Sequence, residues 1–260
     1  MDVLEAQNIS VHLAGTTILS DISLGIEQNK ITSIIGPNGS GKSTLLKALA
    51  RIIPCYQGAI FLDEKNIKTF SHKEIAQKIA ILTQSPEAPA DLTVKDLVEL
   101  GRFPYRSWWK KETDDDQSSV EWALQQTNLL SFAGRIVNTL SGGERQRAWI
   151  AMALAQKPEV LLLDEPTTYL DIAHQLEVML LLKKLNQETG LTVVMVLHDL
   201  NHAFQFSDNI AVIKEGHLWA SGNTSATITE ELLKEVFKVQ VDILAASNGK
   251  TSLLPVGLEK

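Results

Sequence analysis

The stretch Gly36-Pro37-Asn38-Gly39-Ser40-Gly41-Lys42-Ser43 decides the fold of this chain. It follows a β-branched run at 31–35 and precedes a helix-compatible run at 44–50, so the local order is strand, glycine-rich loop, helix. The spacing G-x-x-x-x-G-K-[ST] in that context predicts a phosphate-binding loop. Glycines let backbone N–H groups surround phosphate oxygens, Lys42 can reach the β- and γ-phosphates, and the Ser43 hydroxyl can hold Mg²⁺.

Two alternatives compete with this interpretation. One is a glycine-rich turn that binds nothing. The other is a dinucleotide-binding fold, but Thr44 stands where G-x-G-x-x-G needs its third glycine. We therefore predict that a nucleoside triphosphate binds the residues Gly36, Pro37, Asn38, Gly39, Ser40, Gly41, Lys42, Ser43 and Thr44.

A second apolar strand, at 160–163, ends in Asp164 and Glu165. Residues in this position emerge at the carboxyl edge of a parallel sheet, where a phosphate loop also lies. Asp164 can then orient Mg²⁺ or its water, and Glu165 can polarise an attacking water. Taken alone, such a pair is as often a loop N-cap, but its position behind a phosphate loop favours catalysis.

Composition limits the class of protein. The chain has 260 residues, a formal charge of -7 and 44% hydrophobic residues, which is typical of one large or two small folded domains and excludes intrinsic disorder. The acidic balance argues against nucleic acid as a partner. The lone Cys55 indicates a reducing compartment. No apolar run approaches the roughly 18 to 20 residues of a membrane span, and no secretory signal is expected.

The remaining patterns predict an α/β fold with a mainly parallel sheet, because the runs at 160–163 and 192–197 are continuously apolar. Short segments around 4–6 and 18–26, separated by polar breaks, predict an antiparallel region at the N-terminus. Helical spacing behind a capping box at 113–116 predicts an inserted helical subdomain at about 87–157. The acidic run 114–116 is expected to be a solvated first helical turn, with a calcium site as the alternative.

The stretch Leu140-Ser141-Gly142-Gly143-Glu144-Arg145-Gln146 adds a second helix start that could bind an anion, although a simple helix cap is the alternative. The chain thus contains, in order, the phosphate loop, Gln84, the stretch 140–144, the strand ending in Asp164 and Glu165, and His198. This order resembles that of ABC-type ATPases. His198 alone could be a core histidine. The resemblance covers nearly the whole chain and implies a P-loop NTPase core in a single domain, 1–260.

The resemblance also implies a head-to-tail dimer, in which ATP lies between the phosphate loop of one subunit and Ser141, Gly142 and Gly143 of the other. It assigns Asp171 to contacts across the dimer. It implies that Glu165 is the general base, that His198 contacts the γ-phosphate, that Gln84 contacts Mg²⁺ and water, and that Lys42 contacts the phosphates. The implied Mg²⁺ ligands are Ser43, Gln84 and Asp164.

Two positions depart from the family pattern. Leu13 stands where an aromatic ring commonly stacks on adenine, with His12 beside it. Tyr169 stands in Thr168-Tyr169-Leu170-Asp171 where a small residue is usual, which affects the expected geometry across the dimer. The histidines outside the motifs have no metal-ligand spacing and are expected to be surface or packing residues: His72, His174, His202 and His217.

The stretches 100–105, 144–152 and 170–175 are most similar to importers of iron–siderophore complexes, whose relatives carry haem and vitamin B12. This implies an ATP-hydrolysing subunit on the cytoplasmic face of the cell membrane, working with a separate permease and, indirectly, with a substrate-binding protein. The alternatives are a non-transport ABC ATPase acting on DNA or the ribosome, which usually has coiled coils or basic arms, and a regulatory module without turnover.

An unusual concentration of aromatic residues follows Gln84: Phe103, Tyr105, Trp108 and Trp109. They either pack the helical insert or line a groove that receives a short helix of the permease. After Gly222, a helix at 230–237 and a strand near 239–244 are expected to complete the fold rather than to form a regulatory domain.

Overall fold

The computed structural model describes residues 1–84, 88–106, 113–245 and 251–259. The chain divides into two compact units, one formed by Met1–Thr69 with Thr192–Lys260 and the other by Phe70–Leu191. We call these the first and the second unit. The expected single domain with an insert at about 87–157 stays a prediction.

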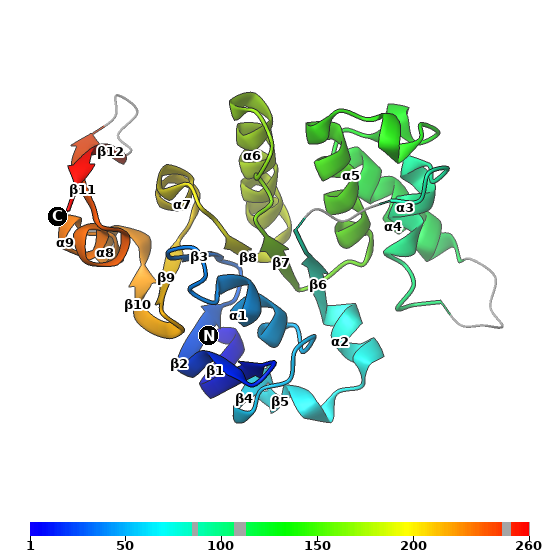
Figure 1. Ribbon diagram of the computed structural model, residues 1–260. Coiled ribbons are helices and arrows are strands. Elements are labelled where there is room, and N and C mark those ends of the chain that lie inside the picture. Colours follow the sequence, from blue (N-terminus) through cyan, green and yellow to red (C-terminus); the bar gives the residue numbers. More distant parts are fainter. Residues whose placement is uncertain (85–87, 107–112, 246–250, 260) are drawn as a thin grey trace. The chain divides into compact units, whose positions relative to one another are not determined.

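The first unit contains most of the strands, coloured blue at its N-terminal part and yellow to red at its C-terminal part in Figure 1. Its N-terminal elements are β1 (Asp2–Leu13), β2 (Thr16–Glu27), β3 (Ile31–Ile35), α1 (Lys42–Leu49), β4 (Gln57–Leu62), β5 (Lys65–Asn66) and η1 (Ile67–Thr69). Its C-terminal elements are β8 (Thr192–Val196), α7 (Leu200–Phe206), β9 (Asn209–Lys214), β10 (His217–Asn223), α8 (Thr224–Thr227), α9 (Glu230–Leu232), η4 (Leu233–Phe237), β11 (Val239–Ala245) and β12 (Thr251–Leu258).

Strand β3 lies at the centre of the first unit, between the parallel strands β8 and β9. All residues of β3 and of β8 are buried, which matches their continuous apolar runs. Ile34 pairs with Val196, so both strands end at the same edge of the sheet. Strand β10 adds to β9 in antiparallel pairing. The sheet is therefore mainly parallel, as predicted.

The N-terminal region is antiparallel, as predicted, with the strand order β2-β1-β4-β5. The expected polar breaks are wrong, because both first strands run for 12 residues. Asn8 and Asp21 instead lie at register shifts, have positive φ angles, and are joined by a 2.9 Å hydrogen bond from Asn8 Nδ2 to Asp21 Oδ1. Bulges absorb the polar residues without ending the strands.

The second unit combines two parallel strands with helices, coloured cyan to yellow-green in Figure 1. Its elements are α2 (His72–Lys78), β6 (Ile79–Leu82), α3 (Val94–Leu100), α4 (Asp114–Gln126), η2 (Leu130–Phe132), η3 (Val137–Thr139), α5 (Gly142–Ala155), β7 (Val160–Asp164) and α6 (Ile172–Thr189). Leu82 pairs with Leu163, so β6 and β7 also end at a common edge.

Capping boxes begin the helices α3, α4 and α5. Thr113 caps α4 as predicted, and Asp114, Asp115 and Asp116 form its first turn. Within the described ranges no group of three or more acidic, histidine or cysteine side chains is placed to hold a metal ion. The expectation of a solvated turn is wrong for Asp116, which is buried. Asp115 and Asp116 instead pair with Arg102, which is almost completely buried.

The C-terminal segment forms α9, the π-helical turn η4 and a hairpin of β11 and β12. The predicted helix at 230–237 and strand near 239–244 are thus confirmed. Asn201 of α7 forms two hydrogen bonds with the backbone of Leu253, and these bonds fix the hairpin to α7. No helix in the described ranges is both long and apolar enough to cross a membrane.

Candidate nucleotide-binding site

The phosphate loop lies between β3 and α1 in the first unit, as the sequence predicts. Three of its glycines have positive φ angles: 154° at Gly36, 76° at Gly39 and 102° at Gly41. A Cβ at Gly36 would overlap the carbonyl oxygen of Ile213, and one at Gly41 would lie 2.6 Å from Leu19 Cδ2. Gly36 therefore requires glycine for space as well as for backbone conformation, and Gly41 requires it for backbone conformation.

The loop has the chemistry to hold phosphate. The Lys42 ammonium is buried and donates to the carbonyl oxygens of Gly36 at 3.0 Å and Pro37 at 2.8 Å, which places a positive charge inside the loop. Ser40 Oγ is buried and has no hydrogen-bond partner among the described residues. Nothing lies within 4 Å of a Cβ built at Gly39. A buried cation, an orphaned hydroxyl and an open loop tip fit a phosphate group.

His198 lies two residues beyond the end of β8 and is exposed. Because β8 is the parallel neighbour of β3, His198 lies at the sheet edge from which the phosphate loop emerges. The first unit therefore brings Lys42, Ser43 and His198 to one edge. The alternative of a buried core histidine is wrong, because the side chain is not in the core.

Gln84 and Glu165 meet at the equivalent edge of the second unit. Gln84 follows β6 and Glu165 follows β7, and Gln84 Nε2 donates to Glu165 Oε2 at 2.8 Å. Thr168 Oγ1 donates to the same oxygen at 3.0 Å. Glu165 has φ 53°, a left-handed conformation that is uncommon outside glycine and that turns the chain directly after the buried Asp164.

Ser141 is the N-cap of α5, and its hydroxyl accepts from the N–H of Glu144 at 3.3 Å while the Glu144 carboxylate accepts from the N–H of Ser141 at 2.8 Å. Hydrogen bonds from the backbone N–H and then the side chain of Ser141 lower the pKa of Glu144. The helix start is thus a regular capping box. Both interpretations of this stretch, a simple cap and an anion site, agree with that geometry.

Asp171 is the N-cap of α6, and its side chain is exposed. Its Oδ1 accepts from the backbone N–H of His174 at 2.9 Å and contacts Nδ1 of the same histidine at 2.8 Å. These two hydrogen bonds, the backbone one first, lower the pKa of Asp171. The sequence analysis missed this contact of His174. The spacing Asp-x-x-His at a helix start could have indicated the N-cap, but not the ring contact.

The two departures from the family pattern are both accessible. Leu13 ends β1 and is exposed, and the neighbouring His12 stacks on Tyr56 with ring centroids 4.3 Å apart. Tyr169 has φ 65° and is 86% exposed, so its side chain points away from the second unit and does not fill its core.

The aromatic residues after Gln84 divide into different environments. Tyr105 packs over the Arg102 guanidinium at 4.0 Å and donates its hydroxyl to the Gln156 carbonyl at 3.0 Å. Phe103 is 70% exposed. Packing thus accounts for Tyr105 and not for Phe103. The predictions for Trp108 and Trp109 lie outside the described residues.

The strand, phosphate loop and helix of the first unit define a P-loop nucleoside triphosphatase. The profile of the family described as ABC transporter matches residues 19–168, more than half of the chain. The chain therefore belongs to the ABC transporter family.

Relatives with assigned names support the narrower resemblance. The iron(3+)-hydroxamate import ATP-binding protein FhuC of Bacillus subtilis (strain 168) is 47% identical over 244 residues, which cover 94% of this chain and 91% of the relative. The petrobactin import ATP-binding protein FpuC of Bacillus anthracis is 48% identical, covering 88% of this chain and 84% of the relative.

A solved structure supports the fold. The dimeric bacterial ABC transporter cassette MJ0796 has a TM-score of 0.74 and 32% identity, covering 85% of this chain and 98% of the cassette. The same cassette has also been solved as a dimer in a post-hydrolysis state with ADP and Pi bound.

Proposed function

We propose that this chain is the ATP-hydrolysing subunit of an ABC importer that takes up an iron–siderophore complex through a separate membrane permease. The observation that carries the proposal is the identity of 47% to a named iron-hydroxamate import ATP-binding protein over nearly the full length of both chains. Relatives named for different siderophores match almost equally well, so the proposal extends to the class of iron–siderophore complexes and to no single member.

The residues of the two sheet edges would share the chemistry of phosphoryl transfer. In the first unit, Lys42 holds the β- and γ-phosphates, and His198 contacts the γ-phosphate. In the second unit, Glu165 accepts a proton from the attacking water, and the hydrogen bond from Gln84 orients the Glu165 carboxylate. Because the loop and its lysine are already formed, the main contributions are positioning and electrostatic stabilisation.

Oxygen ligands are the kind that Mg²⁺ prefers, and we assign Ser43, Gln84 and Asp164 to this ion. When bound, Mg²⁺ would neutralise charge on the phosphate oxygens. Asp164 is buried at the end of β7, directly before Glu165.

The partners follow from the same assignment. We propose a head-to-tail dimer with a second copy of this chain, in which Ser141, Gly142, Gly143 and Asp171 face the nucleotide of the partner copy. The dimeric state of the MJ0796 cassette supports it. The permease would place this chain at the cytoplasmic face of the cell membrane, and a substrate-binding protein would act indirectly by delivering the complex to the permease.

Uptake by a strain that lacks this chain tests the proposal. We expect loss of ⁵⁵Fe uptake from a ferric siderophore, rescue by the wild-type chain, and no rescue by Glu165→Gln at equal expression. Ferric hydroxamate and petrobactin should be tested separately, with haem and vitamin B12 as the competing substrates. Retained uptake of every iron–siderophore complex with loss of haem or vitamin B12 uptake would contradict the substrate class, and no loss of any uptake would contradict the transport role.

A further inference from the structure

The start of α6 lies directly against the start of α5, although the two helices belong to different motifs. Gly143 of α5 is buried, and a Cβ built there would overlap the imidazole ring of His174, with Nε2 only 2.9 Å away. A Cβ at Gly142 would lie 3.4 Å from Leu170 Cδ2. The glycines of the α5 start therefore give room to the segment 170–174.

The other edge of the His174 ring faces Asp171. Nδ1 lies 2.8 Å from Asp171 Oδ1, the same oxygen that accepts the backbone N–H of His174. One ring therefore contacts the α5 start at Cδ2 and the α6 cap at Nδ1. Without the ring contact, the exposed Asp171 carboxylate would be held by backbone N–H groups of 173 and 174 alone and would have more rotamer freedom.

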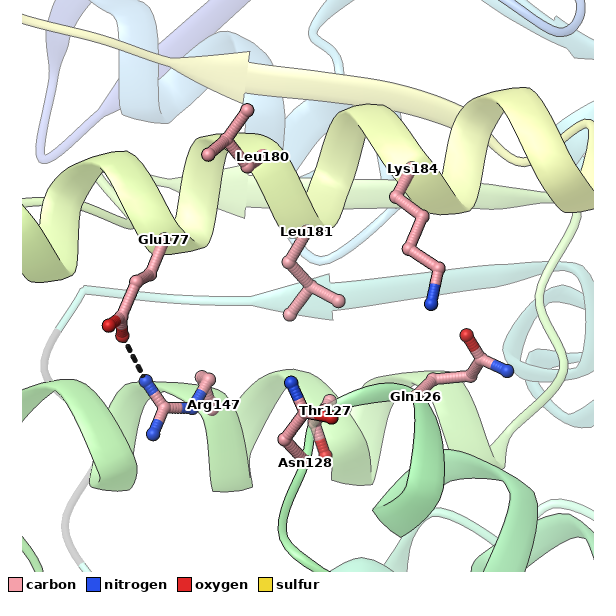
Figure 2. Close-up of a pocket in the computed structure, with 8 residues that line it drawn as sticks. All are labelled: Gln126, Thr127, Asn128, Arg147, Glu177, Leu180, Leu181 and Lys184. Carbon is pink, nitrogen blue, oxygen red and sulfur yellow. Dashed lines mark hydrogen bonds and ion pairs between the residues drawn. The ribbon is translucent and has the colours of Figure 1, made fainter.

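A second contact joins the same helices one turn further along. Arg147 of α5 donates from its guanidinium to the carboxylate of Glu177 of α6, as the dashed line in Figure 2 shows. The pairs Gly143–His174 and Arg147–Glu177 are spaced by four and three residues, so each helix contributes successive positions of one face. Arg147 and Glu177 also line a groove of about 370 Å³ between α6 and the end of α4, across which Lys184 and Gln126 point toward each other.

We propose that His174 is a positioning residue that fixes Asp171 relative to Ser141, Gly142 and Gly143. The two motifs that would face the partner's nucleotide then move as one rigid body. This inference rests on the proposed function, because it concerns how the same site is presented across the dimer. The ring provides the link with two contacts, and Arg147–Glu177 adds a second contact between the two helices.

The chain contains a matched cap that shows what the ring adds. Asp199 caps α7 by accepting from the N–H of His202 at 3.0 Å, with the same Asp-x-x-His spacing. The His202 ring instead contacts Phe206 edge to face, and its Nδ1 has no hydrogen-bond partner among the described residues. Capping a helix therefore does not require the ring to reach the aspartate. The ring contact at Asp171 is an added feature.

ATP hydrolysis by the full chain tests the link, at protein concentrations where the rate per chain is constant. We expect His174→Ala to lower kcat about tenfold while KM for ATP stays within about twofold, because the residue acts on the transition-state geometry. In an Asp171→Ala background the same change should cause no further loss, since the two act as a unit. The control His202→Ala should stay within about twofold of wild type.

Hydrogen exchange of the backbone amides at 141–145 provides a second measurement that does not depend on activity. We expect faster exchange in His174→Ala and no change in His202→Ala. Fully additive effects of His174→Ala and Asp171→Ala, or unchanged kcat with unchanged exchange, would overturn the proposal. If His174→Ala fails to fold, His174→Leu keeps a side chain of similar size against Gly143 and removes the hydrogen bond. An inactive wild-type chain would refute the proposed function, and the exchange result would still decide the role of His174.

Discussion

The starts of α1 and α5 are both glycine-rich helix N-termini, but they are built differently. The α1 start depends on left-handed glycines and has a buried lysine folded into the loop. The α5 start has ordinary backbone angles at Ser141 and a complete capping box. The first leaves a buried hydroxyl orphaned among the described residues, whereas the second satisfies its own first turn.

Because of this difference, the two helix starts should gain different amounts of stability when an anion binds. A loop that leaves a hydroxyl orphaned and holds a buried cation gains stability when an anion binds. A helix start that is already capped gains less stability when an anion binds. Contacts with a neighbouring segment must then fix its position relative to the ligand. For α5 the neighbouring segment 170–174 is in place to provide that position. The predictions below test this contrast.

The largest effect is expected for Glu165→Gln, which keeps the shape of the side chain and removes the base. Turnover should fall by about 10² to 10⁴-fold while ATP binding is retained. ATP should then stabilise a dimer that engages both helix starts, measurable by light scattering with and without ATP. Glu159→Gln, one residue before the same strand, is the control and should turn over normally. Near-normal turnover of Glu165→Gln would contradict the assignment of the base.

Lys42→Ala should weaken ATP binding by about 10- to 100-fold, since it removes a charge-assisted contact to phosphate. Isothermal titration with ATP measures the change. Lys47→Ala removes the same charge from the last turn of α1 and should bind ATP almost as wild type. If the two variants bound ATP with equal affinity, Lys42 would have no special role in phosphate binding, and its assignment to the phosphate loop would be contradicted.

Gly143→Ala should destabilise the second unit by about 1 to 3 kcal/mol, because its Cβ would overlap the His174 ring. Gly142→Ala places its Cβ at an ordinary 3.4 Å from Leu170 and should be neutral or stabilising by up to about 1 kcal/mol, given the helix propensity of alanine. Urea unfolding of both variants measures the difference. Equal destabilisation would contradict the close contact between the α5 and α6 starts.

The smallest expected signal comes from mixing two inactive chains. Lys42→Ala disables the α1 start and Ser141→Arg disables the α5 start, so a heterodimer retains at most one intact site. We expect each variant alone to be inactive and the mixture to recover part of the ATPase rate. Mixing each variant with wild type gives the reference for subunit exchange. A mixture that stays inactive at every ratio, although exchange occurs, would contradict independent sites in a head-to-tail dimer.

Local patterns predicted most of the fold. The strand-loop-helix order at 31–49, the buried strand before Asp164 and the capping box at Thr113 depend on neighbours in sequence, and all are present. The sequence analysis predicted N-terminal strands that were too short, because the bulges at Asn8 and Asp21 form only when the two strands pair. The environments of Phe103 and Tyr105 could not be separated either, since only the buried Arg102 distinguishes them.

By itself, the sequence determined the chemistry available to this protein: a lysine in a glycine loop, an acid after an apolar strand, and a Ser-Gly-Gly helix start. These features depend only on residue types at fixed spacing along the chain, so they can be read before the fold is known. Tertiary structure alone decided which groups touch, such as Gln84 with Glu165 and His174 with both Asp171 and Gly143. Asp171 and Asp199 have the same spacing to a histidine, and only the packing around each ring makes one a link and the other a plain cap.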